Sequence, residues 1–193
     1  MLKINKMLKK LKIFCLTLKA SFFSVFNKNI ESAKFWIEAS KVDPSNPIYP
    51  TTAGQHLWKT SKKNKAENLF IVALKINSKY VPALFNLAFV LQQKNSHEEA
   101  IVLFSKVIKI EPNNDLAVYG RGISYKYLEN YPAAMLDFKN TIKLQPLAPH
   151  AYYHLSRILF EIQNFVELNN IINKLSTFEP QVANQLKKEL NIK

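Results

Sequence analysis

The sequence predicts an all-α protein built from stacked helical hairpins. First, similar side chains recur along almost the whole chain at a fixed interval of 34 residues. Second, the chain of 193 residues is 48% hydrophobic but contains only three glycines. No stretch alternates apolar and polar residues between hairpin turns, as strands do. An interval of this length has room for two short helices, whose apolar faces need neighbouring repeats to cover them.

The interval is clearest from residue 81 to 114, where the sequence reads VPALFNLAFVLQQKNSHEEAIVLFSKVIKIEPNN. Its large, small and proline positions are Leu84, Leu87, Ala88, Leu91, Ala100, Phe104, Val107 and Pro112. The next interval places Val118, Arg121, Gly122, Tyr125, Ala134, Phe138, Thr141 and Pro146 there. The one after it places Tyr152, Leu155, Ser156, Leu159, Leu168, Ile172, Leu175 and Pro180. The preceding interval has Pro50, Ala53, Gly54, Leu57, Ala66, Phe70, Ala73 and Ser78, and a weaker first copy has Leu16, Lys19, Ala20, Phe23, Ser32, Trp36, Ala39 and Pro44.

This pattern resembles the tetratricopeptide repeat (TPR), a helix-turn-helix unit of 34 residues that ends in proline. The resemblance implies a right-handed superhelix, an α-solenoid of five helix-turn-helix units plus a capping helix. A basic segment, residues 1–12, would precede the solenoid of residues 13–180, and residues 181–193 would form the cap. The five repeats would span 13–46, 47–80, 81–114, 115–148 and 149–182.

The first repeat follows a basic segment, MLKINKMLKKLK, and begins in an apolar run, IFCLTLKASFFSVF. Lys19 splits this run, and no small-residue cleavage site follows, so we expect an uncleaved first repeat with Leu16, Ala20 and Phe23 on its first helix. An export signal or a membrane-surface helix is the alternative. No stretch has the roughly 18 apolar residues of a membrane span. We therefore expect a cytoplasmic protein, with a membrane-peripheral or exported one as the alternative.

Local signals place the ends of later helices. Three prolines between residues 43 and 50 predict that the second repeat's first helix begins near Pro50 or Thr51, and that this segment is the weakest boundary of the solenoid. Ser96 and Glu99 have the spacing of a capping box. Pro132 fits the first turn of a helix, where its missing N–H costs nothing.

The capping helix is predicted from one apolar stripe. Val182, Leu186 and Leu190 are spaced four apart in an otherwise polar stretch. A last repeat needs such a helix because its packing face would otherwise meet water.

Chemistry-bearing residues do not form a recognisable catalytic set. His150 and His154 share a helical face, the geometry of a two-histidine metal site, but no HExxH arrangement surrounds them. We interpret them as packing or groove-lining side chains. The single cysteine, Cys15, excludes a disulfide framework. We therefore expect no enzyme, no cofactor and no metal.

The charge is concentrated in the first part of the chain. Residues 1–80 contain 15 lysines and four acidic residues, a net +11, whereas residues 81–193 have a net +2. Such asymmetry suggests an anionic partner, although codon drift in an AT-rich genome would also produce it. Only Arg121 and Arg157 are arginines, which argues against nucleic acid because arginine is the side chain best shaped for phosphate. Two hypotheses remain: a non-catalytic adaptor, scaffold or assembly chaperone, and a peripheral binder of an anionic membrane or nucleic acid through the lysine-rich residues 1–80.

The resemblance also implies a binding groove lined by the first helix of each repeat. The family's groove positions carry mainly aromatic, apolar and cationic side chains here, and we expect most of them to lie outside the core. They are Trp58, Phe85, Phe89, Tyr119, Ile123, Lys126, His150, Tyr153, Arg157 and Phe160. Gln92 stands at a further groove position. We expect the partner to be another protein, held by a peptide segment with apolar anchors and an acidic residue or free carboxylate. A membrane surface could be reached through the first helix.

Overall fold

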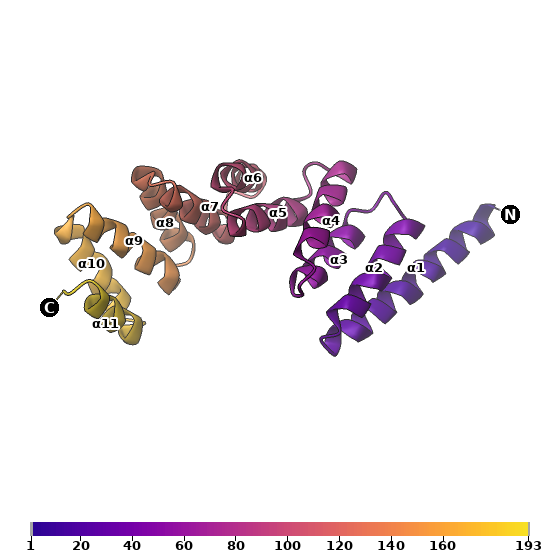
Figure 1. Cartoon of the computed structure of the whole chain (residues 1–193), viewed down its shortest axis with the longest axis horizontal. Coiled ribbons are helices and arrows are strands. Elements are labelled where there is room, and N and C mark those ends of the chain that lie inside the picture. Colours follow the sequence, from indigo (N-terminus) through magenta and orange to yellow (C-terminus); the bar gives the residue numbers. More distant parts are fainter. Residues whose placement is uncertain (1, 193) are drawn as a thin grey trace. The chain divides into compact units, whose positions relative to one another are not determined.

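The computed structural model describes residues 2–192 (Figure 1). Met1 of the predicted basic segment and Lys193 of the predicted cap lie outside the described residues. Over residues 2–192 the structure contains eleven helices and no strand, which confirms the predicted all-α class. The helices of the first half are α1 Leu2–Val25, α2 Asn29–Val42, α3 Ile48–Trp58, α4 Lys63–Ile76 and α5 Val81–Gln93. Those of the second half are α6 His97–Ile110, α7 Asp115–Tyr127, α8 Tyr131–Leu144, α9 Pro149–Glu161, α10 Phe165–Ser176 and α11 Pro180–Glu189.

The chain divides into two compact units inside α5, unit 1 ending at Val90 and unit 2 beginning at Leu91. In unit 1, α2 packs against both α1 and α3, and α3 packs against α4. The predicted weak boundary between residues 43 and 50 is therefore wrong. Helix α3 also begins at Ile48, before the predicted start. The side chain of Asn46 accepts the Ile48 N–H at 3.0 Å, and Pro50 falls in the first turn, where no helical hydrogen bond is lost.

Unit 1 has a core of mainly small side chains. Ala33, Ala39, Ala53 and Ala66 are all at most 1% exposed. Gly54 of α3 faces the ring of Phe70 on α4, and a Cβ at Gly54 would lie 2.6 Å from that ring. The absence of a side chain at Gly54 therefore lets α3 and α4 pack closely around the ring of Phe70.

Unit 2 has a core of larger side chains. Its central cluster joins α8, α9, α10 and α11 through Phe138, Tyr152, Leu155, Leu159, Ile172 and Leu186. The same close packing recurs between α6 and α7, where a Cβ at Gly120 would lie 2.6 Å from the ring of Phe104. Leu186 and Leu190 of the predicted capping stripe are buried in this core.

The helix starts follow the prediction in part. Pro132 lies in the first turn of α8, as predicted. Ser96 does precede α6, but its side chain caps no backbone N–H, so the predicted capping box is wrong. Asparagines cap α7, α8 and α10 instead, with Asn114, Asn130 and Asn164 each accepting a backbone N–H.

Candidate functional site

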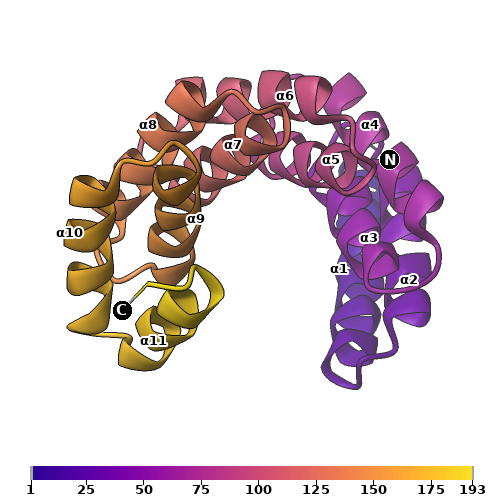
Figure 2. The same ribbon diagram turned by 60° about the vertical axis from the view of Figure 1, so that its left-hand side comes forward.

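In unit 2, the helices that begin each hairpin lie along one side. Figure 2 shows α7, α9 and α11 on this side and α6, α8 and α10 on the other. Seven predicted groove residues come from α7 and α9, and we call them the α7–α9 face. They are Tyr119, Ile123, Lys126, His150, Tyr153, Arg157 and Phe160.

The centre of the α7–α9 face holds a half-buried lysine beside a histidine. Lys126 Nζ lies 3.4 Å from His154 Nδ1. Burial, followed by the charge of Arg157, lowers the pKa of Lys126. No carboxylate of the described residues lies within ion-pair distance of the Lys126 ammonium. The face therefore carries a lysine charge that burial and a neighbouring cation both disfavour.

His154 is the residue of this face that the groove positions missed. Its ring stacks on Phe138 at a centroid distance of 5.6 Å and lies 6.0 Å from the ring of Tyr119. Burial, together with the positive charge of Lys126, lowers the pKa of His154 to about 4, so the imidazole is neutral at pH 7. The available signal was its i, i+4 spacing from His150, from which both histidines are interpreted as packing or groove-lining side chains. The two differ in burial, because His150 is exposed whereas the ring of His154 stacks on Phe138.

The edge of the face is tied to the last helix. Tyr153 OH donates to Glu189 Oε2 at 2.6 Å, and Arg157 Nη1 donates to Tyr153 OH at 2.9 Å. Arg157 also forms an ion pair with Glu189 at 3.2 Å. Phe160 lies farther along α9 with its ring 6.0 Å from that of Phe165. The charge of Arg157 is thus compensated by a direct ion pair, whereas Lys126 has only the more distant charge of Glu161, which offsets part of the lowering of its pKa.

Four members of the face also pack against the core. Tyr119, Ile123, Tyr153 and Phe160 are partly buried against the hydrophobic cluster of unit 2, so the expectation that they lie outside the core is wrong for these four. The ring of Tyr119 lies 5.9 Å from that of Phe138. Ile123 additionally borders a pocket of about 170 Å³, which it shares with Gln92, Gln93, Asn95, His97 and Tyr127.

Gln92 is a structural bridge although it stands at a predicted groove position. It is 8% exposed, and its Nε2 donates to Gly120 O and Ser124 Oγ, each at 2.7 Å. These bonds tie the end of α5 to α7.

The predicted groove residues of unit 1 form a separate aromatic surface. Trp58, at the end of α3, and Phe89, on α5, meet edge to face at a centroid distance of 6.0 Å. Phe89 is 38% exposed, and Lys63 Nζ lies 3.9 Å from the centroid of the Trp58 ring. Phe85 is half-buried on the same helix as Phe89. This surface offers apolar contact with one cation above it.

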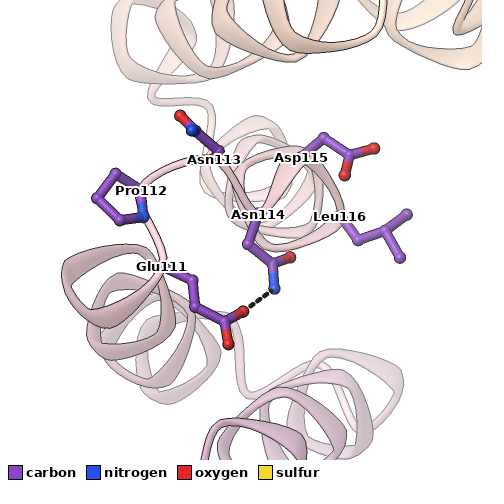
Figure 3. A pocket seen from close by; sticks show the side chains of 6 residues that line it. All are labelled: Glu111, Pro112, Asn113, Asn114, Asp115 and Leu116. Atoms are coloured by element: carbon purple, nitrogen blue, oxygen red, sulfur yellow. Dashed lines mark hydrogen bonds between the residues drawn. The ribbon is translucent and has the colours of Figure 1, made fainter.

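A larger hollow, of about 500 Å³, is lined by none of these residues. It is formed by the turn between α6 and α7, from Glu111 to Leu116 (Figure 3). The carboxylate of Glu111 accepts the Asn114 side-chain N–H at 2.8 Å, and the Asn114 oxygen caps α7. The side chains of Glu111 and Asn114 thus stabilise the turn itself, and we assign no binding role to the hollow.

Helix α1 carries a second exposed apolar surface, which we call the outer stripe. Most of its members recur every three or four residues, and each is more than half exposed. They are Ile4, Met7, Leu8, Leu11, Phe14, Leu18, Phe22 and Val25. The predicted basic segment 1–12 is helical from Leu2 and continuous with the rest of α1.

Among the residues that the structure describes, no helix is long and apolar enough to cross a membrane. The same residues contain no group of three or more histidine, cysteine or acidic side chains that could hold a metal ion.

Comparisons with known proteins agree on one family. The sequence model described as tetratricopeptide repeat matches residues 81–114. Human tetratricopeptide repeat protein 6 is 26% identical over 151 residues, which cover 78% of this chain and 29% of that protein. The chain thus spans less than a third of this curated relative.

Solved structures share the fold. MamA from Desulfovibrio magneticus superposes with a TM-score of 0.82 at 16% identity, covering 88% of this chain and 96% of that one. YrrB, described as a TPR protein with an unusual peptide-binding site, superposes with a TM-score of 0.76 at 18% identity, covering 90% of each chain. These likenesses confirm the predicted solenoid class of fold.

Proposed function

Because the chain is a tetratricopeptide repeat protein, with the fold of a protein–protein interaction scaffold, we propose that it is a non-catalytic adaptor that holds a peptide segment of a partner protein on the α7–α9 face. The partner segment carries an acidic side chain or free carboxylate beside an apolar anchor. Catalysis has no part in this proposal, since peptide capture needs only a shaped surface and charge complementarity.

The observation that supports the acidic group is the environment of Lys126. Its ammonium is half-buried, lies beside a neutral imidazole and is destabilised by the charge of Arg157. Glu161 offsets part of this effect from a distance, and a carboxylate placed at Lys126 would add a counter-charge in direct contact and a charge-assisted hydrogen bond. Lys126 is therefore expected to contribute more to peptide binding than a solvated surface lysine, whose ion pairs contribute little.

The apolar anchor is supported by the neighbours of Lys126. Ile123 lies one helical turn before Lys126 on α7 and borders the pocket of about 170 Å³. Tyr119 precedes Ile123 by another turn, and Tyr153 faces the same side from α9. Aromatic and aliphatic groups beside a polar anchor are typical of surfaces that bind protein segments. In unit 1, Trp58 and Phe89 offer a separate apolar surface of the same kind.

Selection from a displayed library of random peptides tests the proposal. Enriched peptides should share an aliphatic or aromatic residue near an acidic residue or a free C-terminus. In fluorescence anisotropy, Lys126→Gln should weaken the best peptide by about tenfold or more, as expected for a lost charge-assisted hydrogen bond. Lys109→Gln is the matched control, since Lys109 is an exposed lysine on α6, and it should leave the affinity unchanged. Enrichment of no peptide, or equal affinity for Lys126→Gln and wild type, would overturn the proposal.

A further inference from the structure

Helix α1 has two apolar faces, of which unit 1 covers one. The covered face includes Ala20, which is 0% exposed and whose carbonyl accepts the Ser32 hydroxyl at 2.9 Å. It also includes Phe23, whose ring stacks on Phe35 of α2 at 5.5 Å. Figure 1 shows α2 between α1 and α3, so that α1 has a helix of unit 1 along one side only. The outer stripe occupies the opposite side.

The outer stripe is narrow and continuous. At about 100° per residue, its members fall within an arc of about 120° along the whole of α1. Phe14 and Leu18, at its middle, are 61% and 60% exposed. A scattered exposed leucine needs no explanation, but a contiguous apolar surface of this length marks an interaction site.

Lysines flank the outer stripe on both sides. Helix α1 contains six lysines and no acidic residue. At about 100° per residue, Lys3 and Lys10 border the stripe on one side, and Lys12 and Lys19 border it on the other. Lys9 lies toward α2 and pairs with Asp43 at 3.3 Å. The helix is therefore apolar along one side, cationic at both margins of that side, and packed on the protein along the other.

We propose that α1 docks unit 1 on an anionic lipid bilayer, lying in the plane of the membrane interface. In this position the outer stripe enters the boundary between headgroups and acyl chains, and the flanking lysines meet the lipid phosphates. Helix α1 would lie parallel to the membrane surface, in keeping with the finding that no described helix is long and apolar enough to cross a membrane. This role is independent of the α7–α9 face.

The charge distribution favours a bilayer over the other occupants. A second copy of α1 on the stripe would bring the two sets of flanking lysines together, which costs free energy by like-charge repulsion. Nucleic acid would satisfy the lysines but leave the stripe in water. An anionic bilayer satisfies both features, and the net +11 of residues 1–80 adds attraction toward it.

Cys15 allows a direct test. It is the only cysteine of the chain, is exposed, and lies next to Phe14 on the stripe side of α1. We would attach an environment-sensitive fluorophore to Cys15 of the full chain and add phosphatidylcholine vesicles with or without about 30% phosphatidylserine. The proposal predicts a blue shift of the label and co-flotation of the protein with the phosphatidylserine vesicles, both reduced by salt.

Two pairs of variants separate the stripe from its lysines. Phe14→Gln with Leu18→Gln should abolish the blue shift. Lys10→Gln with Lys12→Gln should weaken vesicle binding by roughly fivefold per lysine. The matched controls remove exposed side chains elsewhere, Val102→Gln with Leu136→Gln and Lys106→Gln with Lys109→Gln, and should bind as wild type does. Circular dichroism of each variant establishes that the helices remain.

Three results would overturn the proposal. One is an unchanged label on anionic vesicles. Another is a blue shift without lipid that rises with protein concentration alongside dimers in sedimentation velocity, which would identify a second copy as the occupant. The third is tight binding to duplex DNA with no vesicle binding, which would assign the lysines to nucleic acid.

Discussion

The ionisation of His154 couples the candidate site to folding. Its pKa is lowered to about 4 by burial first and by the charge of Lys126 second, and the charges of His150 and Arg157 act in the same direction. The unfolded chain has an ordinary histidine pKa of about 6.5 and therefore binds a proton first as the pH falls. The contribution of neutral His154 to the free energy of unfolding is thus fully present above about pH 6.5 and is lost progressively as the pH falls toward 4.

This gives a prediction for acid sensitivity. The His154 contribution amounts to about 2–3 kcal/mol of unfolding free energy across that window. Urea unfolding of wild type and His154→Gln at pH 7 and pH 5 should show a smaller pH-dependent loss in the variant. Carboxylates shared by both proteins cancel in this comparison, and His150→Gln is the control from the same helix. An identical pH dependence of wild type and His154→Gln would contradict the assigned environment.

A second residue-scale prediction concerns Gly54. In an exposed helix interior, glycine to alanine stabilises by about 1 kcal/mol. At Gly54 the new Cβ would lie 2.6 Å from the buried ring of Phe70, and overpacking of this kind typically costs about 1–3 kcal/mol. Gly54→Ala should therefore lower the urea midpoint, and Gly122→Ala, whose Cβ would lie 3.0 Å from Phe138, should lower it less. A raised midpoint for Gly54→Ala would show that the ring yields. Adding Phe70→Leu to Gly54→Ala should restore part of the loss.

At the scale of single helices, the caps differ in a way that can be measured. Asn114 accepts the Ala117 N–H at 3.0 Å at the start of α7, whereas the Ser96 side chain makes no such bond at the start of α6. Asn114→Ala should cost about 1 kcal/mol of unfolding free energy, and Ser96→Ala only a few tenths. Equal losses would mean that Ser96 caps α6 in solution.

The helices were predictable from the interval of 34 residues, but their ends were predictable only in part. Side chains that recur at this interval are those that pack between helices, and their positions indicate which segments are helical. Their ends depend on backbone geometry, which the apolar pattern does not report. Asn95, Glu129 and Gln163 recur at the same interval with φ values of 62°, 56° and 58°, in a region that favours glycine. Because none of these three residues is glycine, the sequence gives no glycine signal for the turns that they form.

On the scale of the whole molecule, the sequence predicted which helix side carries the candidate site, but not how its side chains pack. Groove positions identify the side of a helix on which a residue lies, and Lys126, Tyr153 and Arg157 are on the same side of unit 2. Groove positions do not indicate which side chains of the neighbouring helix contact that residue. Tyr119 therefore lies partly in the core, and Arg157 is partly compensated by Glu189. Only the three-dimensional arrangement distinguishes Lys126, which has no such carboxylate among the described residues.

The most direct test of peptide capture on the α7–α9 face is a double-mutant cycle between Lys126 and the acidic residue of a selected peptide. Affinities would be measured for wild type and Lys126→Gln, each with the acidic peptide and its amide counterpart. A repeat of the cycle with Lys109→Gln serves as the control. Direct contact predicts a coupling free energy of about 1 kcal/mol or more at Lys126 and additivity at Lys109. Additive effects at Lys126, with the peptide still bound, would place the peptide elsewhere and contradict the proposed site.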